Sequence, residues 1–198
     1  AAVNTARLHL HDDEIDYVEQ LAKRAAPFLK AEVSVSREYR YVSVTGGIVR
    51  DVFPSGTSKV KTVPCSILTG TRATICAFLR GFFSGDGHSG QVECSAVTVS
   101  QRLADQIRVL LTSLGMYCSL TTSTASYRLA GERIITGDKY LIRILGPDSL
   151  KQFAEEIGFA QESKQQALLE FAARWSPNSD HSFAFKLSAE QLGVLREL

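Results

Sequence analysis

No stretch of this sequence is apolar for long enough to cross a membrane, and its N-terminus has no signal-peptide pattern. Cysteine is scarce, and its four residues form no CxxC pair and lie near no pair of histidines. This pattern excludes a disulfide framework and disfavours a zinc site, so we interpret the cysteines as reduced thiols. The sequence therefore predicts an intracellular protein without a membrane segment, cytoplasmic if its source is prokaryotic.

An excess of charge of one sign is also missing. The chain has 22 basic and 21 acidic residues, which give a net charge of +1. A nucleic-acid-binding domain is usually strongly basic, so DNA binding would require a basic surface confined to one face. The 198 residues, 44% of them hydrophobic, suit one globular domain or two small halves that share a core. No initiator Met precedes Ala1, as expected of a trimmed or excised chain.

The stretch from Thr71 to Gly87 combines features that an ordinary helix does not. A Thr precedes an apolar-periodic run, which predicts a helix over about 71–85, here called the motif helix. Gly81 lies in its middle, where glycine costs about 1 kcal/mol relative to alanine, and this suggests that another backbone approaches closely. Asp86 stands between two glycines at the tip of the helix. Taken locally, an Asp between two glycines is usually a turn residue.

Apolar residues of the motif helix gather on one side. Leu79, Phe82 and Phe83 fall there at helical spacing. They would expose a large apolar face if nothing covered them, and such faces usually mark an interface. We therefore expect another helix to pack on this side.

The same order of elements occurs twice along the chain. Each copy reads as a strand, an amphipathic helix and the two strands of a hairpin, over 5–10, 12–28, 32–36 and 39–45 in the first copy and 92–99, 100–114, 117–128 and 133–145 in the second. Gly46 corresponds to Gly146, and Lys59 corresponds to Lys164. The second copy begins with the motif helix, whereas the first begins directly at its strand. A first motif helix would belong before Ala1.

Leu79 to Gly87 resembles the nine-residue motif of the LAGLIDADG homing endonucleases. Leu79, Gly81, Asp86 and Gly87 match the motif, whereas Ser84 replaces its first acid. The resemblance extends over nearly the whole chain. Several of its parts are typical of intein-encoded and archaeal members, namely Lys61–Pro64, the helix that ends at Leu114-Gly115, Ile157-Gly158-Phe159 and Lys164.

The resemblance implies an α+β fold of two pseudo-symmetric αββαββα halves, whose curved antiparallel sheets form a saddle over DNA. On this basis residues 1–64 form the first half without its motif helix, and residues 65–175 form the second half. Residues 176–198 read as a linker and a short terminal helix over Leu187–Leu198.

The function that the resemblance implies is site-specific hydrolysis of phosphodiester bonds in a long double-stranded DNA target, with Mg²⁺ or Mn²⁺ as cofactor. The chain would be the nuclease part of an intein or an intron-encoded homing enzyme. One alternative is a catalytically incomplete DNA-binding domain or maturase-like relic of the same fold. Another is an α+β interaction module unrelated to DNA, which only the near-neutral charge favours.

The resemblance also implies roles for single residues. Asp86 and the Gly85 carbonyl would bind metal, which suits the preference of Mg²⁺ for hard oxygen ligands. Lys59 and Lys164 would assist catalysis as a symmetric pair, and the alternative for each is a solvated side chain near a helix start. Leu79, Gly81 and Phe82 would pack on a second motif helix, supplied by a missing segment, a partner fragment or a second copy.

The DNA surface is expected on the polar faces of the strands, because Arg and Lys contact phosphates and guanine edges in the major groove. An ordinary solvated sheet face is the alternative for every one of these residues, and His9 with His11 offers a metal pair as a further alternative. The candidate DNA contacts are Arg7, His9, Arg37, Tyr41, Ser43, Thr98, Arg128, Arg133, Lys139 and Arg143.

Overall fold

A computed structural model of the chain describes residues 5–47, 49, 57–90, 93–128 and 134–174. The predicted terminal helix over Leu187–Leu198 lies outside these residues. Within the described part, no helix is both long enough and apolar enough to cross a membrane. All four cysteines are free thiols.

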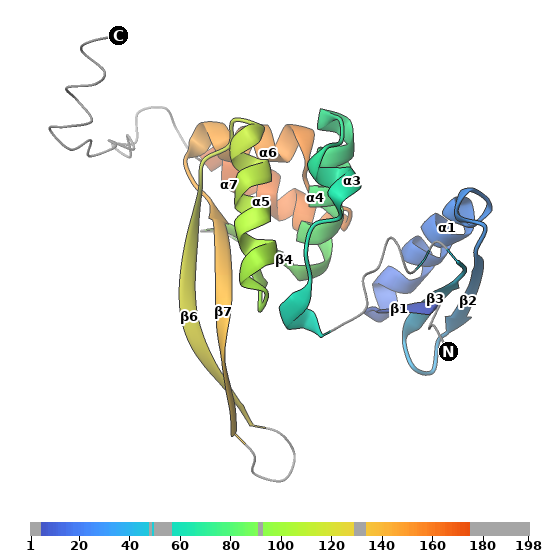
Figure 1. The fold of residues 1–198 in the computed structure, drawn as a ribbon. Helices are drawn as coiled ribbons and strands as arrows, with labels where there is room; N and C mark the ends of the chain where they lie inside the picture. Colours follow the sequence, from blue (N-terminus) through green and yellow to red (C-terminus); the bar gives the residue numbers. More distant parts are fainter. Residues whose placement is uncertain (1–4, 48, 50–56, 91–92, 129–133, 175–198) are drawn as a thin grey trace, which may run out of the picture.

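The first half consists of β1 (Thr5–His9), α1 (Asp12–Leu29), β2 (Glu32–Ser36) and β3 (Tyr41–Thr45). The strands form an antiparallel sheet in the order β1-β3-β2, and α1 covers one face of it (Figure 1). Alternation sets this arrangement, since Val42 and Val44 of β3 point to the helix and are buried. The core here is small, and among the α1 side chains whose burial is described, Ile15 is the one large side chain that is fully buried.

After β3 come the 3-10 turn η1 (Ser58–Val60) and the short helix α3 (Cys65–Leu68). The motif helix is α4 (Arg72–Asp86), one residue from the predicted bounds at each end. Thr71 caps it as expected, because its hydroxyl accepts the Thr74 N–H at 3.3 Å.

The second half continues with β4 (Gly87–Ser89), β5 (Cys94–Thr98), α5 (Gln101–Ser113), β6 (Cys118–Arg128), β7 (Ile134–Ile144), α6 (Pro147–Glu156) and α7 (Glu162–Arg174). Its sheet is antiparallel in the order β4-β5-β7-β6. The alternation did not predict β4, a strand of three residues that holds only one edge of the sheet. The long β6–β7 hairpin extends well beyond the helices (Figure 1).

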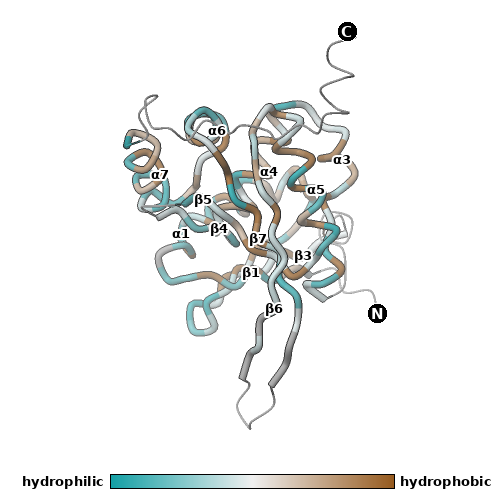
Figure 2. Tube along the Cα trace, turned by 90° about the vertical axis from the view of Figure 1, so that its left-hand side faces the viewer, coloured by the Kyte–Doolittle hydropathy of each residue, from teal (hydrophilic) through white to brown (hydrophobic). Residues whose placement is uncertain are grey.

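The main core lies between the second sheet and its helices. Hydrophobic stretches of β7, α4 and α5 meet there (Figure 2). Leu79 and Phe83 of the motif helix are fully buried in this core, and the Phe83 ring packs 4.8 Å from that of Phe153 and 6.5 Å from that of Phe159. The motif helix is therefore the structural centre of the second half.

Glycines punctuate the second half where the sequence predicted breaks. Gly115 follows α5 with φ of +90°, and Gly146 precedes α6 with φ of +81°. Both values lie in the left-handed region that glycine adopts without steric cost. Ser100 caps α5, since its hydroxyl accepts the Leu103 N–H at 3.2 Å.

Candidate active site and nucleic-acid interface

The candidate active site is the C-terminal end of α4. Gly87 ends the helix, and its N–H donates to the Phe83 carbonyl. Asp86, the last helical residue, has an exposed side chain that makes no hydrogen bond or ion pair with any described residue. Carbonyls of the last turn give a helix C-terminus partial negative charge. The Asp86 carboxylate adds to it, so this end of α4 attracts cations.

Ser84, which replaces the first acid of the motif, is buried and holds the start of α7 against α4. Its hydroxyl accepts the Ala160 N–H at 2.8 Å. Its carbonyl accepts hydrogen bonds from Gln161 Nε2 and Lys164 Nζ, both at 2.8 Å. Arg80, one turn earlier, donates to the Phe159 carbonyl at 3.1 Å. These bonds fix residues 159–164 against the last two turns of the motif helix.

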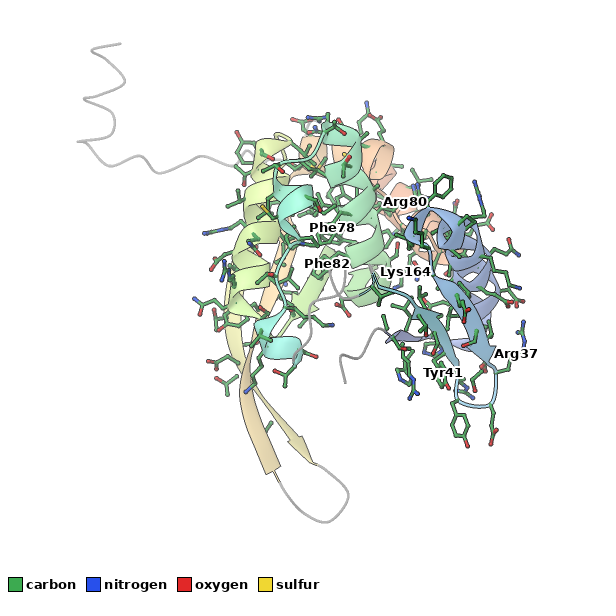
Figure 3. The ribbon with its side chains drawn as sticks, turned by 45° about the vertical axis from the view of Figure 1, so that its right-hand side comes forward. Arg37, Tyr41, Phe78, Arg80, Phe82 and Lys164 are labelled. Carbon is green, nitrogen blue, oxygen red and sulfur yellow. The ribbon has the colours of Figure 1, made fainter. Side chains whose placement is uncertain are left out.

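The structure brings Lys164 to the end of α4, whereas Lys59 makes no contact there. Lys164 is half-buried in the first turn of α7 and lies between the motif helix and the first half (Figure 3). Lys59 is exposed in η1 and has no hydrogen bond or ion pair to the described residues. The predicted symmetry of the two lysines therefore does not extend to their contacts, and their catalytic roles stay predictions.

Two residues at this end of α4 were not predicted. Glu14, in the first turn of α1, accepts a hydrogen bond from Gln161 Nε2 at 2.6 Å, and Gln161 precedes α7. Partial burial raises the pKa of Glu14, but the His11 N–H, the Gln161 amide and the charge of Lys164 outweigh it and hold that pKa below its ordinary value. The sequence marked Glu14 only as a first-turn acid and gave no signal for Gln161, because their contact joins residues 147 apart.

The donor chemistry at the end of α4 fits a hard divalent cation. Asp86 offers carboxylate oxygens and Gly85 a main-chain carbonyl, and Mg²⁺ is usually bound by one or two carboxylates with several of its waters retained. No group of three or more His, Cys, Asp or Glu side chains gathers anywhere in the described part of the chain. His9 and His11 therefore do not belong to a metal cage of such side chains among the described residues.

The face of α4 that is free for another helix differs from the predicted one. Leu79 is fully buried by the second half itself, and Phe82 is half-buried beside Phe83, with their rings 5.6 Å apart. The expectation that a further helix must cover Leu79 is therefore wrong. Gly81 is exposed, and a Cβ added there would meet no atom within 4 Å. Ala77 and Gly85, one turn to each side, are exposed with it.

The outer face of the first sheet carries four predicted DNA contacts. Strand register puts Arg7 opposite Ser43 and His9 opposite Tyr41, on the face away from α1. The Arg7 guanidinium lies 5.2 Å from the centre of the Tyr41 ring, and the His9 ring packs on its edge at 5.6 Å. Ser43 shares this face but is only 6% exposed.

Two predicted DNA contacts lie elsewhere. Arg37, in the turn after β2, pairs with Asp16 of α1 at 2.7 Å and reaches Glu19 at 3.4 Å, so it lies on the helix side of the sheet (Figure 3). The hydrogen bond to Asp16 raises the pKa of Arg37 further. Thr98 was predicted to face outward but is buried, and its hydroxyl accepts the Ser100 N–H at 3.2 Å. Its neighbour Val97 faces outward instead, at 39% exposure.

The outer face of the second sheet carries Lys139 and Arg143 on β7, as the alternation predicted. Arg143 Nε donates to Glu93 Oε2 at 2.8 Å. Glu93 also accepts from the Ser95 hydroxyl at 3.1 Å, so its carboxylate is held by two donors. The side chain of Arg128 and the whole of Arg133 lie outside the described residues.

Part of the chain matches a known domain family. Residues 73–158 match the model of the LAGLIDADG-like domain. A curated relative is the replication factor C small subunit of Thermococcus kodakarensis, 26% identical over 106 residues, which are 54% of this chain and 11% of that protein. This chain thus spans about a ninth of the length of the curated relative it matches.

Solved structures of I-DmoI share the fold. The structure of I-DmoI in complex with DNA and Ca is 14% identical, with 83% of this chain and 81% of that chain covered at a TM-score of 0.55. The mesophilic variants of the homing endonuclease I-DmoI are 15% identical at the same coverage, with a TM-score of 0.56. These matches confirm the predicted α+β fold. Residues 73–158 are therefore identified as a LAGLIDADG-like domain, in a chain that shares the fold of the I-DmoI structures.

Proposed function

We propose that this chain is a site-specific DNA endonuclease that hydrolyses phosphodiester bonds in a long double-stranded target with the help of a divalent metal. The observation that carries the proposal is the exposed Asp86 carboxylate at the end of the motif helix, which has no partner in the described part of the chain. A free carboxylate at the negative end of a helix is unfavourable by itself. A bound cation would balance that charge.

Mg²⁺ or Mn²⁺ fits the oxygen donors of this end of α4. Asp86 and the Gly85 carbonyl would hold it, and the metal would supply an activated water and neutralise charge on the reacting phosphate. I-DmoI has been solved with its target DNA in the presence of Mg and in complex with DNA and Mn. Lys164, held on the Ser84 carbonyl at 2.8 Å, would present a positive charge to the same phosphate.

The outer faces of the two sheets would hold the DNA. Arg7 and Tyr41 on the first sheet, and Lys139 and Arg143 on the second, are the residues whose position supports this role. Basic side chains there would contact phosphates and base edges of the major groove.

A second motif helix would complete the site by packing on Ala77, Gly81 and Gly85. These small residues are exposed at a spacing of four, which lets helix backbones approach closely. The second helix would come from a further segment of the protein, a partner fragment or a second copy, and it would bring the second acid. The proposed division of the chain remains 1–64, 65–175 and 176–198.

An origin as the nuclease part of an intein or as an intron-encoded enzyme completes the proposal. The parts of the sequence typical of intein-encoded members support it. A DNA substrate would place the protein inside the cell, where the four free thiols stay reduced.

A catalytically incomplete DNA-binding relic of the same fold is the second candidate. The observation that favours it is Ser84, which stands where the family motif has its first acid and uses its hydroxyl for a structural bond to Ala160. Asp86 then remains as the one acid of this motif helix.

Cleavage of a plasmid library with Mg²⁺ tests the two candidates, with the parent chain compared with Asp86→Asn. The variant keeps the size of the side chain and removes the charge that binds metal, so it should not cut. Cutting at one long site by the parent only would establish the endonuclease. Salt-sensitive DNA binding by both proteins without cutting by either would favour the relic. Equal cutting by both would remove Asp86 from the mechanism.

A further inference from the structure

Glu14 of the first half is held in a fixed orientation. Its Oε2 accepts the His11 N–H at 3.0 Å, which ties the carboxylate to the start of its own helix as in a capping box. Its other oxygen, Oε1, accepts a hydrogen bond from Gln161 Nε2 at 2.6 Å. The first half thus offers a pre-oriented acceptor to the second half.

Gln161 uses one amide nitrogen for two bonds that lead to different halves. Nε2 donates to Glu14 Oε1 at 2.6 Å and to the Ser84 carbonyl at 2.8 Å. Its Oε1 is buried and has no partner among the described residues. Rotating the amide by half a turn would bring that oxygen against a carboxylate and a carbonyl, so the two acceptors determine the orientation. Buried acceptors without partners are uncommon, which indicates that the two bonds of Nε2 outweigh this loss.

Lys164 shares the carbonyl that Gln161 binds. Lys164 follows Gln161 by three residues, and its Nζ donates to Ser84 O at 2.8 Å. The Glu14 carboxylate is also close enough for the charge of Lys164 to lower its pKa. Glu14 therefore attracts Lys164 directly, and Gln161 joins Glu14 to the carbonyl that Lys164 also binds. A flexible lysine with three donors would otherwise sample many positions.

We propose that Glu14 and Gln161 are positioning residues that hold the Lys164 ammonium at the Ser84 carbonyl, beside the end of the motif helix. The effect on catalysis rests on the proposed function, whereas the effect on the position of Lys164 rests on the hydrogen bonds alone. Through Glu14, the first half would become part of the site without contributing a motif helix.

The structural consequence is tested by acetylating the folded protein with acetic anhydride and following Lys164 by mass spectrometry. In Glu14→Ala and in Gln161→Ala the ammonium loses its support, so Lys164 should be labelled several-fold faster than in the parent. Asp12→Ala is the matched control, since it removes a carboxylate of the same helical turn that pairs with Arg40. Gln166→Ala, on α7, is the control for the amide.

Conservative variants keep the test decisive if an alanine variant unfolds. Glu14→Gln keeps an oxygen that accepts from Gln161 and should keep Lys164 closer to the parent's labelling rate than Glu14→Ala does. Gln161→Met keeps the length of the side chain and removes the amide, so it should behave as Gln161→Ala. Unchanged labelling of Lys164 in folded Glu14 and Gln161 variants would overturn the inference.

Single-turnover cleavage supplies the catalytic readout. The rate at saturating DNA should fall about tenfold in either alanine variant, since misplacing a group that acts on the phosphate is costly. The double variant should be no slower than the slower single one, and DNA affinity should stay unchanged. Cleavage at the parent rate in both variants would overturn the catalytic part. If the parent cuts no DNA, the proposed function fails, whereas the labelling still decides the geometry.

Discussion

Ser84 and Asp86 are two residues apart on the motif helix, yet their side chains meet opposite environments. Helical geometry turns Ser84 towards α7, where its hydroxyl accepts the Ala160 N–H, and turns Asp86 to solvent. An acid at position 84 could also accept a hydrogen bond from the Ala160 N–H, but it would place a charge in a buried position. The replacement by serine is therefore compatible with the bond that holds the start of α7.

The Glu93–Arg143 pair should make the stability of the fold depend on pH. Burial raises the pKa of Glu93, but the Arg143 and Ser95 hydrogen bonds and the nearby Arg143 charge outweigh it, so the pKa lies below its ordinary value of 4.5. A carboxyl with a lowered folded-state pKa stabilises the fold above its unfolded-state pKa. That stability is lost as the pH falls through the folded-state pKa.

Replacing Glu93 by Gln should therefore matter more at neutral pH than in acid. We expect the parent to exceed Glu93→Gln in unfolding free energy by up to about 1 kcal/mol at neutral pH, because the pair is partly exposed. The difference should shrink as the pH falls below the ordinary pKa. Urea unfolding at several pH values measures it, and a difference that grows in acid would contradict the assignment.

Single site residues were predictable only where local pattern decides. Asp86 follows from its glycines and from the end of the helix. Thr98 was assigned outward on weak alternation, and the pairing of β5 with β7 reverses it. Arg37 was assigned to the DNA surface as a basic residue in a turn. No local pattern around it indicates that its guanidinium pairs with Asp16 of α1. Glu14 and Gln161 meet across 147 residues, which no local pattern reveals.

At the scale of elements, the motif helix has one face in the core and one face that is exposed. Leu79 and Phe83 point into the second-half core, whereas Ala77, Gly81 and Gly85 point outward. The sequence predicted the bounds of the helix, because its cap, its period and its terminal glycines are local signals. It did not predict which face remains free, since large apolar residues fit both a core and an interface.

Because Gly81 is exposed, we expect substitutions there to affect the stability of the chain and its cleavage of DNA differently. Gly81→Ala should raise the unfolding free energy of the chain by about 0.5–1 kcal/mol, because alanine favours the helix and meets no atom there. Gly81→Leu should be tolerated by the chain as well. It should nevertheless greatly weaken DNA cleavage, because the long side chain keeps a second motif helix away.

Lys151→Ala, an exposed change on α6, is the control for both readouts. Urea unfolding and plasmid cleavage measured side by side separate the two effects. Full cleavage by Gly81→Leu would contradict the proposed helix contact. Destabilisation by Gly81→Ala would show instead that another element already covers this face.

At the scale of the whole molecule, ion pairs sort the cations into paired and unpaired ones, which the net charge of +1 does not show. Acids neutralise Arg37, Arg40 and Arg72 away from the outer sheet faces, and Glu93 neutralises Arg143 on the outer face of the second sheet. The sequence predicted the two-copy order of strands and helices, because alternation and glycines mark each element. It could not show this sorting of charge, since most of the ion pairs join distant residues.

This sorting predicts which cations contribute to DNA binding. Lys139 faces outward on β7 and has no ion pair with the described residues, so Lys139→Ala should remove one phosphate contact. The slope of log affinity against log salt should fall in magnitude by about one, with affinity reduced to a similar degree for all DNA sequences. Arg37→Ala should leave the slope unchanged, because its guanidinium is already paired with Asp16 on the far side of the first sheet.

Fluorescence anisotropy measures both slopes over a range of salt concentrations, with a duplex of random sequence and with a duplex that contains the site cut in the plasmid library. Because the two substitutions remove the same charge from the same chain, they shift its net charge equally. A general electrostatic effect would therefore change both slopes alike, whereas a DNA surface confined to the outer sheet faces separates them. Equal slopes in the two variants would contradict the saddle as the binding surface, and a reduced slope in Arg37→Ala alone would move that surface to the helix side.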